Sequence, residues 1–171
     1  NEQATRETVL EGWLHTGDLG EKTERGLIRI KGRKKEIMKT SGGKMIAPVP
    51  IEGRIKELSL VGQACMVGDG RKYLSVLLTL SEAGMEKVKA DPKAVQGQIV
   101  QQPEILAAIK AHLDALNREL ASFEQVKRFA VLAKDFTIEN DEMTPSLKMK
   151  RAVIENHYQQ VIESLYTGAR D

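Results

Sequence analysis

Two apolar runs separated by a short turn constrain the fold of this chain more than any other feature. Val61–Val67 and Tyr73–Leu80 consist largely of aliphatic residues, as expected for buried strands. Gly68-Asp69-Gly70, which lies between them, has turn chemistry. We therefore predict two neighbouring strands in a buried sheet. The longer run is far shorter than the ~20 apolar residues that cross a bilayer, so it predicts no membrane span.

One helix is predicted before these strands in the chain and another after them. Pro50 suits the first turn of a short helix in which Ile51, Ile55 and Leu58 share one face. Pro103 suits the start of a longer helix. The apolar residues of that helix recur every three or four positions, as in a face that packs on a sheet: Leu106, Ile109, Leu113, Leu116, Leu120 and Phe123.

The remaining segments complete a small α+β domain. Asp91-Pro92 has the pattern of a helix cap followed by proline at the first helical position. Phe129–Leu132 is a strand candidate, and Lys150–Tyr166 is predicted as one closing helix. Thr137–Lys148 is polar and has no periodicity, and loops held by packed flanks often carry catalytic groups. The domain is expected to begin at about residue 34.

Residues 1–33 are expected to belong to a different domain. They offer short strands around a turn at Thr23–Gly26, and an isolated hairpin is marginally stable at best. The segment begins without methionine and has no signal-peptide pattern. We therefore predict two parts, 1–33 from a larger preceding domain and 34–171 as the small domain.

The overall charge is balanced, but one stretch is strongly basic. The chain has 26 Lys and Arg residues against 24 Asp and Glu residues, a net charge of +2, which is too small for a general nucleic-acid or membrane surface. Ile28–Pro50 nevertheless contains seven basic residues and the glycines Gly32, Gly42 and Gly43. Glycines let the backbone approach a ligand closely. This stretch is either a solvated surface or a site for a nucleotide or polyphosphate.

Several common site motifs are excluded. Gly12 and Gly17 have the glycine spacing of a P-loop, but Asp18 stands where that loop needs lysine. A carboxylate there would repel phosphate and suit ribose hydroxyls, because it accepts two hydrogen bonds. The three histidines are far apart in sequence, so no structural metal site is predicted. The single cysteine, Cys65, lies in an apolar run and indicates core packing in a reducing, cytoplasmic compartment.

Three motifs in order carry a family resemblance. They are the run from Gly12 to Asp18 (GWLHTGD), the run from Gly32 to Lys39 (GRKKEIMK) followed by Gly42-Gly43 and Glu52, and the run from Thr144 to Lys148 (TPSLK). Together they resemble signature motifs of the adenylate-forming enzymes, and within that superfamily the long-chain acyl-CoA synthetases. The resemblance implies the small C-terminal domain of that fold, a mixed sheet with helices packed on it, preceded by a β-hairpin of the large domain.

The resemblance also implies an ATP-dependent acid–thiol ligase. A fatty acid would react with ATP, as its Mg²⁺ complex, to give an acyl-adenylate, and coenzyme A would then form the thioester. A large N-terminal domain would hold the acid, the metal and most of the nucleotide, so the chain alone is expected to be inactive. Peripheral association of the full-length enzyme with a membrane is left open, and nucleic acid is not an expected partner.

Roles for individual residues follow from the same resemblance. Asp18 would accept hydrogen bonds from the ribose, and Arg33 would contact ribose or phosphate. Lys35 would be the hinge about which the small domain rotates. The thioester-forming pose would bring Lys39 to the active site as a catalytic residue, and would place Gly42 and Gly43 at the tunnel for the pantetheine arm. Lys148 would reach the reacting groups during adenylation.

The last motif departs from the commonest pattern. Leu147 precedes Lys148, where many adenylate-forming enzymes have glycine, and long-chain acyl-CoA synthetases resemble the version found here. A positioned ammonium at Lys148 would stabilise the charge that develops on the carboxylate and α-phosphate oxygens. Lys150 is a less favoured candidate for the catalytic lysine of adenylation. Lys150 and Arg151 are otherwise interpreted as solvent-facing or capping residues.

Two alternatives remain at this point. An adenylating domain that loads the phosphopantetheine of a carrier protein would use the same domain rotation. A basic module that binds nucleic acid through Arg29–Lys44 is a non-enzymatic alternative. That stretch contains no aromatic residue, whereas single-stranded nucleic acids are usually bound by stacking on aromatic side chains.

Overall fold

The computed structural model describes residues 2–89 and 95–167. Its centre is a mixed sheet of three strands in the order β11-β8-β7. Strands β7 (Val61–Val67) and β8 (Leu74–Leu80) are antiparallel, and β11 (Val126–Val131) lies parallel to β8. The predicted strands and the α+β class with a mixed sheet are confirmed. The Asp91-Pro92 cap lies outside the described residues.

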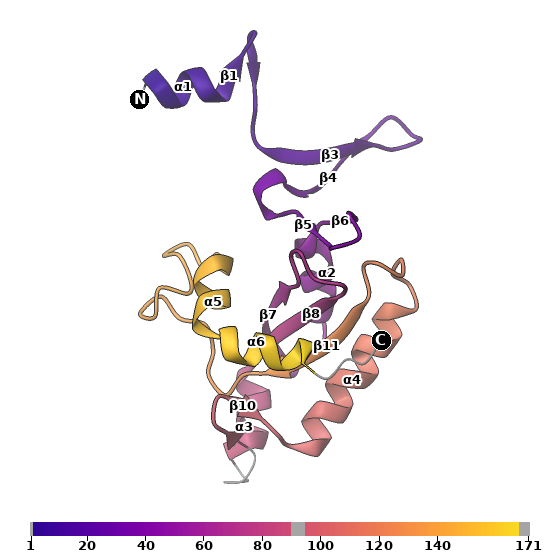
Figure 1. The fold of residues 1–171 in the computed structure, drawn as a ribbon, viewed down its shortest axis with the longest axis vertical. Coiled ribbons are helices and arrows are strands. Elements are labelled where there is room, and N and C mark those ends of the chain that lie inside the picture. Colours follow the sequence, from indigo (N-terminus) through magenta and orange to yellow (C-terminus); the bar gives the residue numbers. More distant parts are fainter. Residues whose placement is uncertain (1, 90–94, 168–171) are drawn as a thin grey trace.

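Helices cover both faces of this sheet (Figure 1). One core joins alternate residues of β7 and β8 to α2 (Pro48–Ile55), α3 (Glu82–Lys89) and α4 (Pro103–Asn117). The opposite core joins Cys65, Val67 and Leu77 to the short helices α5 (Arg151–His157) and α6 (Gln159–Tyr166). Every residue of β8 is buried, which explains why its sequence is a continuous apolar run.

Three helix boundaries differ from the sequence predictions. Helix α2 begins at Pro48 rather than Pro50, because extended Ala47 serves as its N-cap and proline is favoured just inside a helix. Helix α4 ends at Asn117, where the Asn117 side chain bonds the main-chain N and O atoms of Val126. The predicted closing helix is broken at Tyr158 into α5 and α6 (Figure 1), and the buried Tyr158 ring packs edge-on against Phe136.

The N-terminal segment projects away from this three-layer body (Figure 1). It contains the helix α1 (Glu2–Thr8), the two-residue strands β1 (Val9–Leu10) and β2 (Trp13–Leu14), and a hairpin of β3 (Asp18–Lys22) with β4 (Ile28–Arg33). Its large apolar side chains are mostly exposed, with Trp13 at 76% and Ile28 at 69%. The division at residue 33 stays a prediction.

The basic stretch forms three successive elements before α2 begins at Pro48. It starts as β4, continues as the 3-10 turn η1 (Lys34–Glu36), and ends as a second hairpin of β5 (Met38–Lys39) with β6 (Met45–Ile46). One small antiparallel pairing, β9 (Val95–Gln96) with β10 (Ile99–Val100), lies before α4.

Candidate active-site surface

Asp18 and Arg33 meet across the β3–β4 hairpin. They are register partners, and the Nε atom of Arg33 lies 3.0 Å from Oδ1 of Asp18. The Arg33 side chain is 58% exposed and that of Asp18 is 33% exposed. Because exposed ion pairs contribute only about 0–1 kcal/mol, a polar ligand can replace this contact at little cost. The structure thus brings together the two residues proposed for ribose and phosphate contacts.

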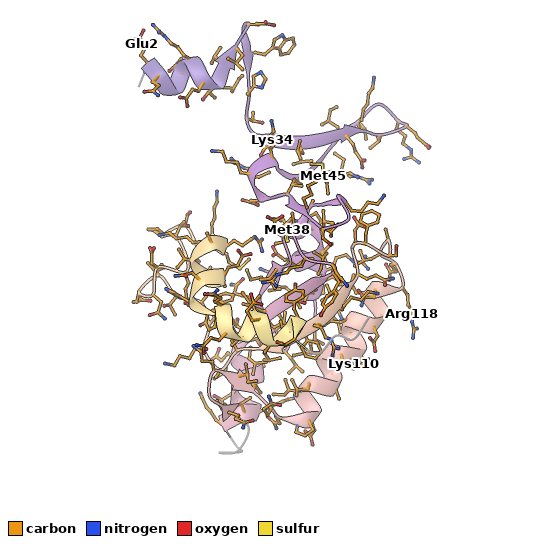
Figure 2. All side chains as sticks on the ribbon, in the orientation of Figure 1. Glu2, Lys34, Met38, Met45, Lys110 and Arg118 are labelled. Carbon is orange, nitrogen blue, oxygen red and sulfur yellow. The ribbon has the colours of Figure 1, made fainter. Side chains whose placement is uncertain are left out.

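Lys35 lies at the junction between the projecting hairpin and the body. It is the middle residue of η1, its side chain is exposed, and extended residues, Arg33 and Ile37, flank this turn. Figure 2 shows the neighbouring Lys34 at the base of the hairpin and Met38 at the edge of the body. The amide of Lys34 donates to the carbonyl of Gly17 at 2.7 Å. The turn is therefore the short connection that a hinge at Lys35 requires.

The β5–β6 hairpin, with Lys39, Gly42 and Gly43, is fixed to the turn between β7 and β8. Oδ1 of Asp69 accepts a 2.7 Å hydrogen bond from the Lys39 amide, and the Lys39 carbonyl accepts one of 2.8 Å from the amide of Gly70. Gly43 has a φ of 78°, a conformation that favours glycine. These bonds hold the hairpin backbone while the Lys39 side chain stays exposed.

Lys148 lies on a preformed turn rather than on a flexible loop. The Lys148 amide donates to Oγ1 of Thr144 at 3.0 Å, and its carbonyl accepts from the Thr144 amide at 2.8 Å. Met143 and Met149 form an antiparallel bridge across the base of the turn. Leu147 has a φ of 58° and is 69% exposed. The 143–149 turn therefore presents Lys148 to solvent from a closed backbone.

Lys150, the alternative catalytic lysine, is held in a contact of its own. Its ammonium pairs with Asp141, and its amide donates to the carbonyl of Glu142 at 2.8 Å. No such partner for the Lys148 ammonium occurs in the part of the chain that the structure describes. This difference favours Lys148 as the group that can reach a substrate.

Buried Glu142 anchors the start of the 143–149 turn. Its carboxylate accepts a hydrogen bond from the Thr137 amide at 3.1 Å and lies 3.3 Å from Nδ1 of His157. Burial, together with the negative charge of Glu142, raises the pKa of Tyr158 to about 12, so the tyrosine stays neutral beside the carboxylate. Nothing in the local sequence distinguishes Glu142 from its acidic neighbours, and sequence reasoning missed it.

Arg151 was wrongly interpreted as solvent-facing or capping. Its guanidinium lies 2.8 Å from Oε1 of Glu52, and the side chains are 19% and 5% exposed. Burial raises the pKa of Glu52, and the charge of Arg151 opposes that rise. Its partners, Glu52 and the Met66 carbonyl, are distant in the sequence, so no local pattern indicated these contacts.

A basic cavity adjoins Gly42. It has a volume of about 340 Å³, and its lining includes Lys44, Lys127 and the ring of Phe123. The Lys44 ammonium lies 5.7 Å from the centre of that ring, which is 38% exposed. Cations beside an exposed aromatic face suit a phosphorylated nucleotide.

The candidate residues form three separate groups. Asp18 lies with Arg33, the β5–β6 hairpin carries Lys39 and the two glycines, and the 143–149 turn carries Lys148 beside α5 (Figure 1). Among the described residues, no group of three His, Cys, Asp or Glu residues could hold a metal ion. Likewise, no helix in the described ranges is long and apolar enough to cross a membrane.

Comparisons with known proteins identify the family of this chain. Residues 35–170 match the family model of the AMP-binding enzyme C-terminal domain. The chain is 36% identical to a long-chain-fatty-acid–CoA ligase of Mycobacterium tuberculosis over 170 residues, covering 97% of the chain and 28% of the relative. It is also 36% identical to a long-chain-fatty-acid–CoA ligase of Xenopus laevis over 180 residues, covering 93% of the chain and 24% of the relative.

Solved structures show the same fold. The adenylation domain of a carboxylate reductase from Mycobacterium chelonae superposes with a TM-score of 0.78 at 24% identity, over 96% of this chain and 25% of that one. The corresponding domain from Segniliparus rugosus, solved with AMP and a carboxylic acid, gives 0.77 at 23% identity, over 98% of this chain and 26% of that one. This chain spans about a quarter of the length of the relatives it matches. It belongs to the family of AMP-binding enzyme C-terminal domains.

Proposed function

We propose that this chain is the C-terminal part of an ATP-dependent long-chain fatty acid–CoA ligase. In the first half-reaction the fatty-acid carboxylate attacks the α-phosphorus of ATP and pyrophosphate leaves. In the second, the thiol of coenzyme A attacks the carbonyl of the acyl-adenylate and AMP leaves. The family match and the names of the relatives support this proposal.

The observation that carries the proposal is the placement of candidate groups on two separate turns of one packed body. Lys148 lies on the 143–149 turn, whereas Lys39, Gly42 and Gly43 lie on the β5–β6 hairpin. The hairpin is bonded to the turn between β7 and β8, and Met143 of the 143–149 turn is buried in the core on one face of the sheet. The body is joined to the projecting hairpin through η1. Rotation about Lys35 would present Lys148 for adenylation and the β5–β6 hairpin for thioester formation.

Each polar residue has a defined task in this scheme. Lys148 stabilises the charge that develops on the carboxylate and α-phosphate oxygens, a contribution realised mainly in the transition state. Asp18 accepts hydrogen bonds from the ribose hydroxyls, and Arg33 contacts the ribose or phosphate. Mg²⁺ would neutralise charge on the ATP phosphates, and its ligands are expected in the N-terminal domain.

The basic cavity supports free coenzyme A as the acceptor. The nucleotide end of coenzyme A carries an adenine ring and phosphates, which match the Phe123 ring and the ammonium groups of Lys44 and Lys127. The cavity adjoins Gly42, which is proposed to line the path of the pantetheine arm. A thiol lacking the nucleotide would leave this cavity unused.

The test is to assay both half-reactions of the full-length protein. We expect ATP–pyrophosphate exchange that depends on a long-chain fatty acid, followed by thioester formation with coenzyme A. A phosphopantetheinylated acyl carrier protein is offered as the competing acceptor. Exchange without any fatty-acid dependence would contradict the acid substrate, and a preference for the carrier protein would contradict coenzyme A.

Lys127→Ala in the full-length protein is expected to raise KM for coenzyme A about tenfold, which corresponds to the loss of one charge-assisted hydrogen bond. The rate of ATP–pyrophosphate exchange should not change, because that step precedes thiol binding. Lys110→Ala is the matched control, since Lys110 pairs with Asp114 on α4 outside the cavity. An unchanged KM in Lys127→Ala would exclude the cavity as the nucleotide site.

A further inference from the structure

Buried Glu52 and partly buried Arg151 form an ion pair that no proposed catalytic step uses. Glu52 is on α2 and Arg151 is the first residue of α5, 99 positions later in the chain. Oε1 of Glu52 lies 2.8 Å from Nη2 of Arg151. Glu52 is one of five buried polar or charged residues among those that the structure describes, so its environment is unusual for a carboxylate.

Both members of the pair also bond the same residue of strand β7. The Met66 amide donates to Oε1 of Glu52 at 2.7 Å, and the Met66 carbonyl accepts from Nη1 of Arg151 at 2.6 Å. Strand β7 is at the edge of the three-stranded sheet, and edge strands expose unpaired main-chain groups. The pair therefore fixes α2 and α5 to one point on the sheet edge.

This point lies close in sequence to both functional turns. Arg151 follows Lys148 by three residues, and Glu52 follows the β5–β6 hairpin by one turn and a half of α2. Glu142 anchors the other end of the 143–149 turn, through its bond to the Thr137 amide. The 143–149 turn is thus held between buried Glu142 and partly buried Arg151.

Stability alone is a weak reason for such a pair. The desolvation of two buried charges often cancels their attraction, and well-packed apolar replacements are frequently neutral or stabilising. What an apolar pair cannot do is bond both main-chain groups of Met66 and orient the start of α5. The orientation of α5 matters for a reaction that depends on the position of Lys148, since a displacement of about 1 Å can lower a rate ~10²-fold.

We propose that Glu52 and Arg151 are positioning residues that hold the 143–149 turn at a fixed position relative to the β5–β6 hairpin. Arg151 fixes the first residue of α5 in place, and hence the position of Lys148 during adenylation. Glu52 orients Arg151 through the shared contact with Met66. This inference rests on the proposed ligase function and adds residues that do not touch the substrate.

The experiment compares single and double replacements in the full-length protein. Arg151→Met and Glu52→Met should each lower Tm, because each leaves a buried charge without its partner. The double variant removes both charges and should recover most of the lost Tm. Its adenylation kcat should nevertheless remain ~10²-fold below wild type, with KM for ATP unchanged. Thioester formation from supplied acyl-adenylate should be affected less.

Two further variants separate positioning from folding. Arg151→Lys keeps the charge but replaces the planar guanidinium, whose Nη2 and Nη1 reach Glu52 and Met66 separately, by one shorter ammonium, so we expect a folded protein with adenylation reduced about tenfold. Arg54→Met removes an exposed ion pair with Glu119 from the same helix α2, and both half-reactions should remain at wild-type rates. Wild-type adenylation in Arg151→Lys, or recovery of adenylation together with Tm in the double variant, would overturn the inference. An inactive wild-type protein would instead refute the proposed function.

Discussion

Replacing Lys148 by alanine in the full-length protein should slow formation of the acyl-adenylate at least ~10²–10³-fold, the usual cost of losing one preorganised charge donor. The turn itself should persist, because its bonds use the Lys148 main chain and Oγ1 of Thr144 rather than the lysine side chain. Thioester formation from supplied acyl-adenylate should survive, since the β5–β6 hairpin serves that step. Single-turnover measurements of each half-reaction give both rates.

Lys150→Ala is the matched control for this variant. Lys150 is two residues away and pairs with Asp141 on the surface, and an exposed pair contributes about 0–1 kcal/mol. We expect at most a several-fold effect on either half-reaction. If Lys148→Ala slowed both steps equally, or if Lys150→Ala had the larger effect on adenylation, the assignment of Lys148 would be wrong.

The central sheet was predictable because its signal is local. Val61–Val67 matches β7 at both ends, and β8 begins only one residue after the predicted start at Tyr73. A short, continuous apolar run bounded by glycine turns is compatible with few structures other than a buried strand. Helix α4 was found for the same reason, although Asn117 ends it before Leu120 by bonding to Val126.

The sequence predictions that were wrong or incomplete concern tertiary contacts, which a periodic pattern does not reveal. The apolar residues of α5 and α6 keep a helical spacing across Tyr158, so the sequence does not reveal that the chain bends there. Glu142 is buried and Arg151 is partly buried, although their residue types are usually exposed. Their partners are distant or main-chain groups, which no local window identifies.

The candidate site was predicted from the family resemblance rather than from physical patterns. Sequence alone described residues 137–148 as an aperiodic polar loop, whereas the structure closes 143–149 into a turn with Leu147 at positive φ. A leucine in that conformation costs about 1–2 kcal/mol, and its side chain is exposed. Neither packing nor backbone preference explains leucine there.

Lys35→Pro in the full-length protein should abolish one half-reaction, which we expect to be thioester formation, while adenylation persists. Proline fixes φ near −65° and restricts the preceding residue to extended conformations. Lys35 lies inside η1, where Lys34 is helical, so the substitution alters the only short connection between the projecting hairpin and the body in the described residues. A domain locked in one pose can complete only the step that uses that pose.

Lys35→Ala separates the main chain of the hinge from its side chain. The Lys35 side chain is exposed, and alanine leaves φ and ψ free, so both half-reactions should proceed at close to wild-type rates. Each half-reaction is measured separately, adenylation by pyrophosphate exchange and thioester formation from supplied acyl-adenylate. If Lys35→Pro left both rates at wild-type values, rotation would occur elsewhere in the chain. If Lys35→Ala lost the same step as Lys35→Pro, the lysine side chain, and not the main-chain rotation, would be what that step requires.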